Sequence, residues 1–547
     1  MSNVEGRKPM LGRNTGVELV PRPSESPLDP LNWPQWKKEL AFGSLVLGGA
    51  VIGILKTILV TVNGVIATEL NCSYMAATAL TGLPLIIGAF SGMGSTVLAQ
   101  KVGKRGIYLT SSVLLLAGAI WNMHVEQSYA QFMVSRIFQG VAWGAFESLV
   151  LTSFNDMFFV HQRSRHVVLY NISNIFFTWG TPILGGYLSQ TNQGFRNQIM
   201  AINIIQAFSI VFLIFATPET TFSRSSTSTS TSQSPNTTTV SAPSAGKFKS
   251  YLSTLRFTIP PSSSTSKSKM TRPLRALAAP TTILTFLLTA PPTATALAVA
   301  STLSLLFSSM PTFLFPARIG YLFIAPLVLS LLLYTASSFT LPRAPRSKQA
   351  HTQPFLIAIP ALILAFAGTL AFGLYTYGKL MSTTRAKGSQ FTLYVQGQDL
   401  SLQIVSVLFG LLVAGAVLVN AAGVSIVTAT SALGSKSQQD EDFDEEESAS
   451  NALQFAHKLL QDVLTGIFII GMPLWVKSGA DMLAGLKDAA IALAVVQVVI
   501  GSSVAALLWA QGEGVARLDA RVLGVSGGRG YGQDVLELKK GDSYFEA

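Results

Sequence analysis

Two ionisable side chains lie within one apolar run, FMVSRIFQGVAWGAFESLV, and their spacing suggests shared chemistry. Arg136 and Glu147 are eleven residues apart, about three helical turns, so a helix places them on nearly the same face. A charged group in apolar surroundings is costly unless it meets an opposite charge, a backbone carbonyl or water. We interpret Glu147 as a reversible proton carrier and Arg136 as the leading coupling residue in a shared cavity. The alternatives are a static partner for Glu147, either Lys56 or a hydroxyl, and an Arg136 guanidinium that reaches from the helix end to the membrane interface.

The possible partner, Lys56, lies in a second apolar run, VIGILKTILVTVNGV. Asn63 follows seven residues later and is therefore also expected on about the same face. Both side chains are predicted to face the interior of a helical bundle. Lys56 could bind a substrate or a counter-ion, whereas the asparagine is more simply explained by a hydrogen bond to a neighbouring helix.

Composition predicts which elements position these residues. The chain has 547 residues, of which 49% are hydrophobic and only 12% charged, and its mean hydropathy is +0.45. A soluble protein keeps roughly a quarter of its residues charged, so most of this surface does not face water. Runs of about 20 apolar residues can cross the hydrocarbon core of a bilayer as helices. The predicted fold class is therefore an all-α integral membrane protein.

Twelve such runs form two sets of six, which predicts 12 transmembrane helices in two six-helix bundles. This plan is typical of transporters whose substrate path lies between two helical repeats. Asp399, Lys458 and Asp462 are predicted at the entrances of their spans, where charged side chains reach the interface. The runs lie near residues 41–67, 75–99, 107–123, 131–154, 167–190, 197–217, 277–307, 316–341, 354–378, 400–431, 457–476 and 484–510.

The segments outside the runs complete the predicted domain organisation. The connector is rich in Ser, Thr, Pro and Lys and is predicted to be disordered, because it cannot bury enough apolar surface to fold alone. The predicted parts are an N-terminal tail (1–40), an N-terminal bundle (41–217), the connector (218–275), a C-terminal bundle (276–510) and a C-terminal tail (511–547).

The distribution of basic residues predicts the orientation of the chain. Lys and Arg gather after the second, fourth, sixth and eighth runs, which is the pattern of cytosolic loops, so both termini are predicted in the cytosol. Among the three glycosylation sequons only Asn71 is then predicted to face outside. The single cysteine, Cys72, leaves no intramolecular disulfide and no cysteine-based metal site, and no metal or cofactor is expected.

The stretch TVLAQKVGKR resembles the loop between spans two and three of the major facilitator superfamily, whose pattern is Gly-x-Leu-Ala-Asp-Arg-x-Gly-Arg-Lys. The resemblance implies a gate that locks the cytosolic side, and topological anchoring by the cations is the alternative. Gln100 stands where the family has an aspartate that takes part in this lock. The other positions of the gate motif are Leu98, Ala99, Lys101, Gly103, Lys104 and Arg105.

Two further motifs resemble the same superfamily. Arg136, Gln139 and Gly140 match its Arg-x-x-Gln-Gly signature. The stretch WGTPILGGYL is similar to the motif Gly-Pro-x-x-Gly-Gly of its exporters, and a general small-residue packing face is the alternative. The residues of this antiporter-like motif are Gly180, Pro182, Gly185 and Gly186.

Stretches at 26–38, 156–165 and 215–224 resemble the fungal drug:proton antiporter branch of that superfamily. The resemblance implies a secondary active transporter that exports a small organic compound, such as a drug, toxin or secondary metabolite, in exchange for protons. A proton-coupled uptake carrier for a nutrient and a non-transporting sensor with the same fold remain alternatives. The five histidines are predicted in loops or at span ends and form no HExxH motif, so an enzyme is not indicated.

The expected partners follow from the same observations. They are a small-molecule substrate, protons and membrane lipid. The basic pI of 9.6 could suggest nucleic acid, but the cations cluster beside the spans and favour anionic lipid headgroups instead. We expect a monomer in the plasma membrane.

Overall fold

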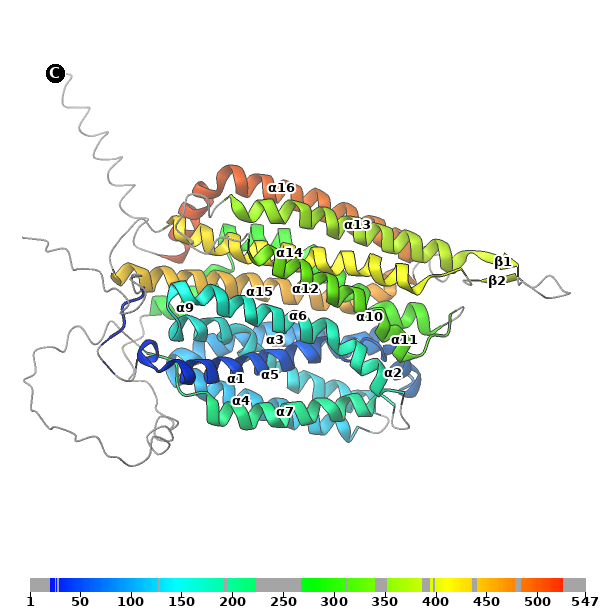
Figure 1. Cartoon of the computed structure of the whole chain (residues 1–547), viewed down its shortest axis with the longest axis horizontal. Helices are drawn as coiled ribbons and strands as arrows, with labels where there is room; N and C mark the ends of the chain where they lie inside the picture. Colours follow the sequence, from blue (N-terminus) through cyan, green and yellow to red (C-terminus); the bar gives the residue numbers. More distant parts are fainter. Residues whose placement is uncertain are drawn as a thin grey trace, which may run out of the picture.

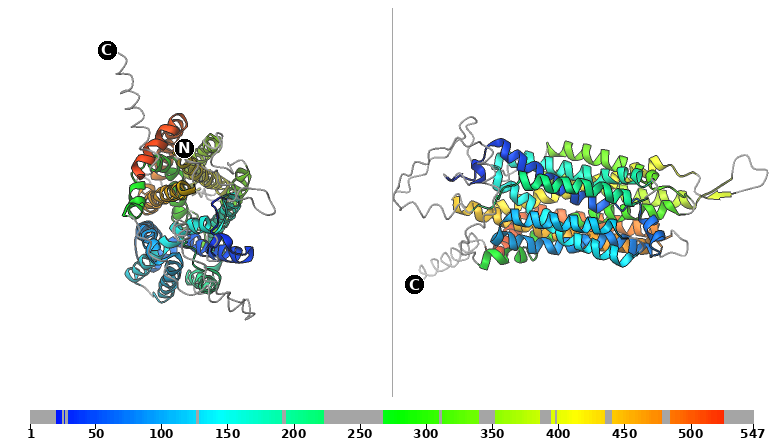
Figure 2. Two further views of the ribbon diagram at one scale, coloured as in Figure 1. Left: turned by 90° about the vertical axis from the view of Figure 1, so that its left-hand side faces the viewer. Right: turned by 90° about the horizontal axis from the view of Figure 1, so that it is seen from below.

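The structure is a computed structural model of the chain, and it is almost entirely helical (Figure 1). The helices run side by side, with the N-terminal half of the sequence on one side and the C-terminal half on the other, as the end-on view of Figure 2 also shows. The residues that the structure describes are 20–24, 26, 29–125, 128–190, 194–222, 267–309, 312–339, 352–385, 394–396, 399–434, 440–477 and 484–524.

The N-terminal half forms one six-helix bundle, preceded by a short 3-10 helix at Pro30–Asn32. Serine residues begin two of its helices, because the hydroxyls of Ser73 and Ser128 accept hydrogen bonds from backbone N–H groups that the first turn leaves free. The helices are α1 (Gln35–Thr57), α2 (Asn63–Glu69), α3 (Tyr74–Val102), α4 (Lys104–Met123), α5 (Tyr129–Met157), α6 (Val160–Leu188) and α7 (Arg196–Ala216).

The C-terminal half forms the second bundle. Its helices are α10 (Pro280–Ser308), α11 (Pro316–Tyr321), α12 (Ile324–Ser338), α13 (Gln353–Met381), α14 (Leu402–Gly434), α15 (Asp440–Val476) and α16 (Ala484–Leu523). The two bundles meet mainly where α3 packs on α15 and where α6 packs on α11 and α12. These contacts make the interface between the bundles the natural place for a mobile substrate path.

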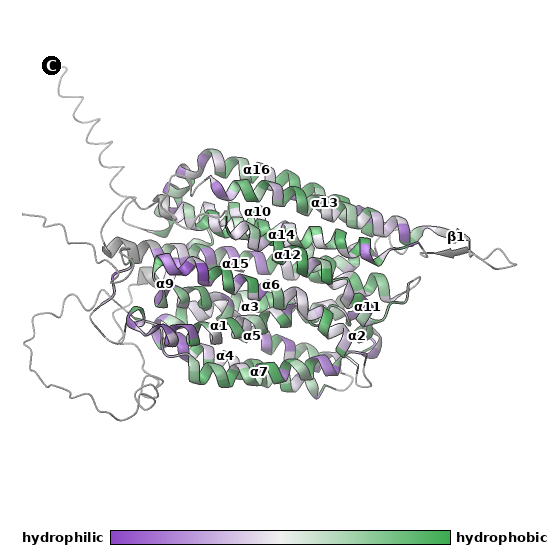
Figure 3. Cartoon of the chain, viewed as in Figure 1, coloured by the Kyte–Doolittle hydropathy of each residue, from purple (hydrophilic) through white to green (hydrophobic). Residues whose placement is uncertain are grey.

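Eleven of the described helical segments are long and apolar enough to cross a membrane, judged by length and composition. Helix α5 is the twelfth, and its lower hydropathy reflects Arg136, Glu147 and Asp156. Hydrophobic residues extend along the length of the helices in Figure 3. The predicted fold class, twelve membrane helices in two bundles, is confirmed.

Two spans are discontinuous, one in each bundle. The first span breaks between α1 and α2, at residues 58–62, and the eighth breaks between α11 and α12, at Leu322 and Phe323. Broken helices leave backbone carbonyls without their helical donors, and transporters use such breaks beside their binding sites. Lys56 lies in the last turn of α1, immediately before the first break.

The two ends of the helical bundle differ in the elements that they carry. The terminal end is where α1 begins and α16 ends. The hairpin end carries β1 (Thr383–Arg385) and β2 (Tyr394–Gln396), which pair antiparallel between α13 and α14 (Figure 1). This hairpin was not predicted from the sequence. Its strands are short, and polar residues such as Lys, Gly, Ser and Gln lie between them.

Two predicted boundaries are wrong. The connector was predicted to be disordered as far as residue 275, but α9 (Lys267–Ala276) is helical and packs on α15, α16 and α3 at the terminal end. Most of the connector, residues 223–266, lies outside the described residues. The last span was predicted to end at residue 510, but α16 continues to Leu523 beyond a kink at Gln511. The residues after the kink are polar, so they were predicted to belong to the C-terminal tail. In the structure they continue the helix beyond its apolar part.

Candidate coupling site at the bundle interface

Lys56 and Glu147 form an ion pair in the N-terminal bundle. Glu147 lies in the middle third of α5, and its carboxylate contacts the ammonium group of Lys56 at the end of α1. Both side chains are largely buried. The ion pair between Glu147 and Lys56, which the sequence analysis gave as an alternative, is therefore present. Whether Glu147 can also bind and release a proton depends on its other neighbours.

A second ion pair, on α15 of the other bundle, lies beside the first, with its carboxyl group buried and its lysine partly exposed. Lys458 and Asp462 are one helical turn apart, and their charged groups are in contact. The side chains of Asp462 and Glu147 interact with each other, and both lysines interact electrostatically with both carboxyl groups. We call Lys56, Glu147, Lys458 and Asp462 the charge cluster. It joins α1 and α5 of one bundle to α15 of the other.

The contact between the two carboxyl groups has a chemical consequence. An ionised carboxylate can only accept hydrogen bonds, so Glu147 and Asp462 can bond to each other only while one of them carries a proton. Loss of that proton leaves two carboxylates side by side, and like charges repel strongly in a low dielectric. Proton binding therefore changes the attraction between α5 and α15, and with it the attraction between the bundles.

The two residues that the C-terminal bundle contributes to this cluster do not lie where the sequence predicted them. Lys458 and Asp462 were predicted at a span entrance, but α15 begins at Asp440, and Asp462 is only 4% exposed in the middle of the helix. His457 was likewise predicted at a span end and is buried inside the same helix. The acidic stretch before residue 448 suggested a loop, although acidic residues favour the first turns of a helix.

Arg136 has different partners from Glu147. Its side chain is 2% exposed, and its Nε donates to the carbonyl oxygen of Leu80 at 2.9 Å. This is the carbonyl that Pro84 leaves without a helical donor in α3. Its Nη2 donates to the carbonyl oxygen of Leu55 at 3.1 Å, near the end of α1. Arg136 thus fixes the broken first span against the proline-containing α3.

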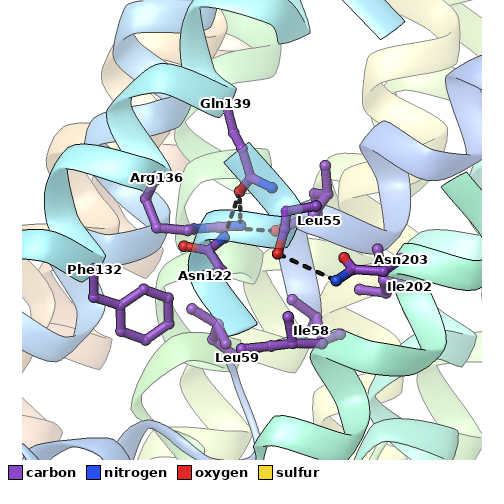
Figure 4. A pocket seen from close by; sticks show the side chains of 11 residues that line it. Leu55, Ile58, Leu59, Asn122, Phe132, Arg136, Gln139, Ile202 and Asn203 are labelled. Atoms are coloured by element: carbon purple, nitrogen blue, oxygen red, sulfur yellow. Dashed lines mark hydrogen bonds between the residues drawn. The ribbon is translucent and has the colours of Figure 1, made fainter. Parts of the chain in front are cut away.

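Gln139 and Gly140 complete this arrangement. The side-chain oxygen of Gln139 accepts from Arg136 Nη1 and from Asn122 Nδ2, each at 3.0 Å, and Figure 4 shows both donors converging on it. A Cβ atom at Gly140 would lie 2.8 Å from the Cα of Pro84, so glycine allows α5 to pack closely on α3. The Arg-x-x-Gln-Gly signature therefore connects three helices.

A small cavity lies beside Arg136, between α1, α4, α5 and α7 (Figure 4). Its volume is about 10 Å³, room for about one water molecule. Arg136, Gln139 and the amides of Asn122 and Asn203 line it together with apolar side chains. Glu147 is not among the lining residues, so this cavity does not bring Arg136 and Glu147 together as the sequence suggested.

The gate motif is held mainly within the N-terminal bundle. Gly103, between α3 and α4, has a φ of 89°, and a Cβ atom there would lie 2.5 Å from Glu219 Oε2. The Glu219 carboxylate accepts from the backbone N–H groups of Lys104 at 3.0 Å and Arg105 at 3.1 Å. A carboxylate at a helix N-terminus is favourable because it satisfies free N–H groups and the helix dipole. Sequence reasoning gave Glu219 no role.

The side chains of the gate motif divide into buried and exposed groups. Lys104 forms an ion pair of 2.6 Å with Asp156 at the end of α5. Ala99 is buried, whereas Leu98, Gln100 and Lys101 are exposed on the last turns of α3. These contacts brace α4 against α5 and against the chain after α7.

Other residues connect the two bundles at the terminal end. Arg163, at the start of α6, forms an ion pair of 3.1 Å with Glu447 of α15. Asn155 of α5 donates to the side-chain oxygen of Asn451 at 2.9 Å. We call these four residues the terminal clasp. The sequence marked Arg163 only as a basic loop residue and did not identify the other three, because their pairing joins segments almost 300 positions apart.

The antiporter-like motif also lies at the bundle interface. A Cβ atom at Gly186 would be 2.5 Å from the carbonyl oxygen of Pro316, and one at Gly320 would be 2.7 Å from that of Pro182, so α6 and α11 pack backbone to backbone. Gly180 faces Leu327 of α12 at 3.6 Å. Small residues permit such close helix contacts in membranes.

The proline and the remaining glycine of this motif face the N-terminal bundle. Pro182 leaves the carbonyl oxygen of Thr178 without a helical donor, and the hydroxyl of Thr57 donates to it at 2.6 Å. A Cβ atom at Gly185 would meet the side chain of Gln198 on α7 at 3.1 Å. The motif thus links α1 and α7 to the interface formed by α6 and α11.

Asn63 and its neighbour connect the bundles near the hairpin end. Asn63 Nδ2 donates to the carbonyl oxygen of Ser301 on α10 at 3.0 Å, and the N–H of Gly64 donates to the hydroxyl of Ser304 at 2.9 Å. The predicted common helical face of Lys56 and Asn63 is wrong, because the helix is broken between them. Described contacts therefore join the bundles at both ends and in the middle.

Comparisons with known proteins agree with this architecture. Residues 45–435 match the family model described as Major Facilitator Superfamily. In the solved structure of the proton:xylose symporter XylE, the fold is similar with a TM-score of 0.56 and 14% sequence identity, over 87% of this chain and 96% of that chain. At this identity the likeness concerns the fold alone.

Relatives in sequence come from yeasts. An uncharacterised MFS-type transporter of Schizosaccharomyces pombe, C1271.10c, is 28% identical over 40% of this chain and 37% of its own length. The MFS antiporter QDR3 of Candida albicans is 28% identical over 28% of this chain and 22% of its own length. Each match thus spans well under half of the relative. The family match over most of the described helices shows that the chain belongs to the Major Facilitator Superfamily.

Proposed function

We propose that this protein exports a small organic compound across the membrane in exchange for protons, by alternating access between its two bundles. The observation that carries the proposal is the charge cluster, in which carboxyl groups from opposite bundles, Glu147 and Asp462, interact with each other and with two lysines in the middle of the spans. Substrate and proton would bind in turn, because each occupancy favours a different arrangement of α5 and α15.

Two further features support export over uptake. The backbone contact between α6 and α11 uses the glycines and proline of the antiporter-like motif, Pro182 and Gly186. One relative is named as an antiporter, which agrees with exchange against protons. A proton-coupled uptake carrier with the same fold is the competing function. The direction of the pH gradient that drives accumulation distinguishes export from uptake.

The proposal is tested with inside-out vesicles from cells that express the protein, with rhodamine 6G as an amphipathic fluorescent probe. Export in exchange for protons predicts that the dye accumulates in vesicles with an acidic interior and that a protonophore abolishes the accumulation. Vesicles from cells without the protein provide the baseline. Accumulation only with an alkaline interior would support proton-coupled uptake, and no accumulation under either gradient would exclude export of an amphipathic cation.

The terminal clasp provides a test of alternating access. Paired substitutions Asn155→Cys and Asn451→Cys, introduced with Cys72→Ser, place two thiols at side chains now 2.9 Å apart. Oxidation or a short bifunctional reagent should join α5 to α15 and stop dye transport, and reduction should restore it. Each single cysteine variant serves as a control and should remain active after oxidation. Undiminished transport by the fully cross-linked protein would show that the clasp does not open.

The single cysteine offers a test of orientation. Cys72 is partly exposed between α2 and α3, at the hairpin end, which we propose to face outside. Burial raises the pKa of the Cys72 thiol, so labelling should be done at alkaline pH, where the reactive thiolate is present. A membrane-impermeant maleimide should label Cys72 in intact cells. The exposed Lys101, changed to Cys with Cys72→Ser, should react only after permeabilisation, and the reverse pattern would place both termini outside.

Asn71 lies beside Cys72 and remains the glycosylation candidate. It is exposed, and its φ of 46° places it in the turn after α2. Loss of a mobility shift on Asn71→Gln or after glycosidase treatment would identify a glycan. Asn171 is hydrogen-bonded to the hydroxyl of Tyr334 between α6 and α12 and is not accessible to glycosylation.

A further inference from the structure

A row of hydroxyl groups runs along α10 toward the charge cluster. Thr281, Thr285, Thr289 and Thr293 are spaced one helical turn apart, so they share one face of the helix. Helix α10 packs mainly against α15, and also against α14 and α16. Helices α10 and α14 contain no Asp, Glu, Lys, Arg or His, so the ionisable groups beside this face come from α15 and α16 and, at the terminal end, from the basic helix α9 that packs on both.

A buried histidine bridges two of these hydroxyls. His457 is 1% exposed, its Nδ1 lies 3.3 Å from the hydroxyl of Thr285, and its Nε2 lies 3.3 Å from the hydroxyl of Thr289. An imidazole can accept a proton at one ring nitrogen and release one from the other. The geometry places such a group between consecutive turns of α10, where the hydroxyls alone are too far apart to exchange a proton directly.

Carboxyl groups lie at both ends of the row. At the terminal end, Asp519 of α16 is buried and accepts from the backbone N–H of Thr281 at 3.1 Å. At the inner end, Gln461 Nε2 donates to the hydroxyl of Thr293 at 2.8 Å, and the next residue is Asp462 of the charge cluster. The polar groups thus extend from the Asp519 carboxyl group to the turn of α15 that carries Asp462.

Several atoms along this path lack a described hydrogen-bond partner. They include the hydroxyl of Thr281, Oε1 of Gln461 and Oδ2 of Asp519, all of them buried. Buried polar atoms are normally satisfied by protein or by ordered water, so these atoms mark positions where water can bridge the row. The methyl group of Thr289 packs against α14 at Gly423, where a Cβ atom would lie 2.3 Å from its Cγ2.

We infer that this row, from Asp519 through His457 to Asp462, conducts protons between the terminal end and the charge cluster. The inference rests on the proposed proton-coupled function and names the route that supplies it. In exchange against protons, Asp462 gives up its proton toward Nε2 of His457, Nδ1 releases one to threonine hydroxyls and water, and Asp519 passes it out at the terminal end. An imposed fall in pH at the terminal end drives the same steps in reverse. Only protons move, and each transfer leaves the imidazole in its other tautomer and the hydroxyls turned the other way. The ring and the hydroxyls must therefore reorient before the next proton passes. The charged groups nearest to His457 on this path are Lys458 and Asp462 on its own helix and Asp519 on α16.

The test measures proton arrival at Asp462 directly, without a transported compound. Purified protein in liposomes is subjected to a rapid fall in pH, and the carboxyl C=O stretching band is followed by time-resolved infrared spectroscopy. Asp462→Asn identifies the band by removing it. His457→Phe and His457→Gln should both slow its appearance by about tenfold or more, because glutamine keeps polar contacts but cannot exchange protons between two ring nitrogens.

Two threonines on α10 form a matched control. Thr289→Val should slow the band, whereas Thr302→Val should not, although both hydroxyls are buried and donate to carbonyls of their own helix. An unchanged rate in His457→Phe, or full rescue by His457→Gln, would overturn the inference and leave the charge cluster intact. If the wild-type protein shows no band that depends on Asp462, the proposed coupling site itself fails, and the inference with it.

Discussion

Asp462→Asn and Glu147→Gln should each abolish dye accumulation driven by a pH gradient, with a loss of at least about 100-fold. The amides keep the size of the side chains, but they cannot bind and release a proton. The contact between α5 and α15 would then no longer change with proton occupancy. Gradient-driven accumulation in inside-out vesicles measures the effect.

Exchange without a gradient distinguishes lost coupling from lost folding. Both variants should still exchange external dye for dye trapped inside the vesicles, because this process needs no net proton movement. Glu513→Gln is the matched control, since Glu513 is 77% exposed on α16 and its side chain pairs only with the exposed Arg517 among the described contacts. Normal gradient-driven transport by Asp462→Asn would contradict a coupling role for the cluster.

Arg136→Leu should strongly destabilise the folded protein. It removes the donors to Leu80 and Leu55, and each buried carbonyl oxygen left without a donor costs about 1–3 kcal/mol. We expect the thermal unfolding midpoint in detergent to fall by about 5 °C or more. Arg136→Lys should recover little of this stability, because one ammonium group cannot reproduce three separately directed hydrogen bonds.

The control for this prediction is Arg517→Leu, which removes an exposed arginine from α16 and should leave the midpoint almost unchanged. From the sequence, Arg136 is interpreted as the leading coupling residue, which is the alternative to this structural role. That alternative would be supported if Arg136→Leu kept the wild-type midpoint and dye exchange but lost gradient-driven accumulation. The contacts of Arg136 with backbone carbonyls predict the opposite combination.

The spans could be predicted because their signal is compositional. Long apolar runs identified the helices, and the polar connector divided them into two sets, since membrane crossing requires about 20 apolar residues whatever the neighbours are. Boundaries were less accurate where charge and helix coincide. The acidic start of α15 resembled a loop, so Asp462 was placed at the edge of the membrane although it lies near the centre of its helix.

The candidate site could be predicted only in part, because pairing depends on tertiary structure. Lys56 and Glu147 stood out as charges in apolar runs, and the structure brings them together. Their partners on α15 are over 300 positions further along the chain, and one sequence contains no signal for that distance. The spacing along a helix also misled in two places. Lys56 and Asn63 do not lie on one continuous helix, because the first span breaks between them. Arg136 and Glu147 lie on nearly the same face of α5 but have different partners.

Proton release on binding of rhodamine 6G tests the central claim most directly. The dye is added to purified protein in weakly buffered detergent solution, and a pH indicator records the protons released. Proton coupling through the charge cluster predicts release of up to about one proton per bound dye by the wild-type protein and none by Asp462→Asn. Both proteins should still bind the dye. Equal proton release by the wild-type protein and Asp462→Asn would contradict this coupling.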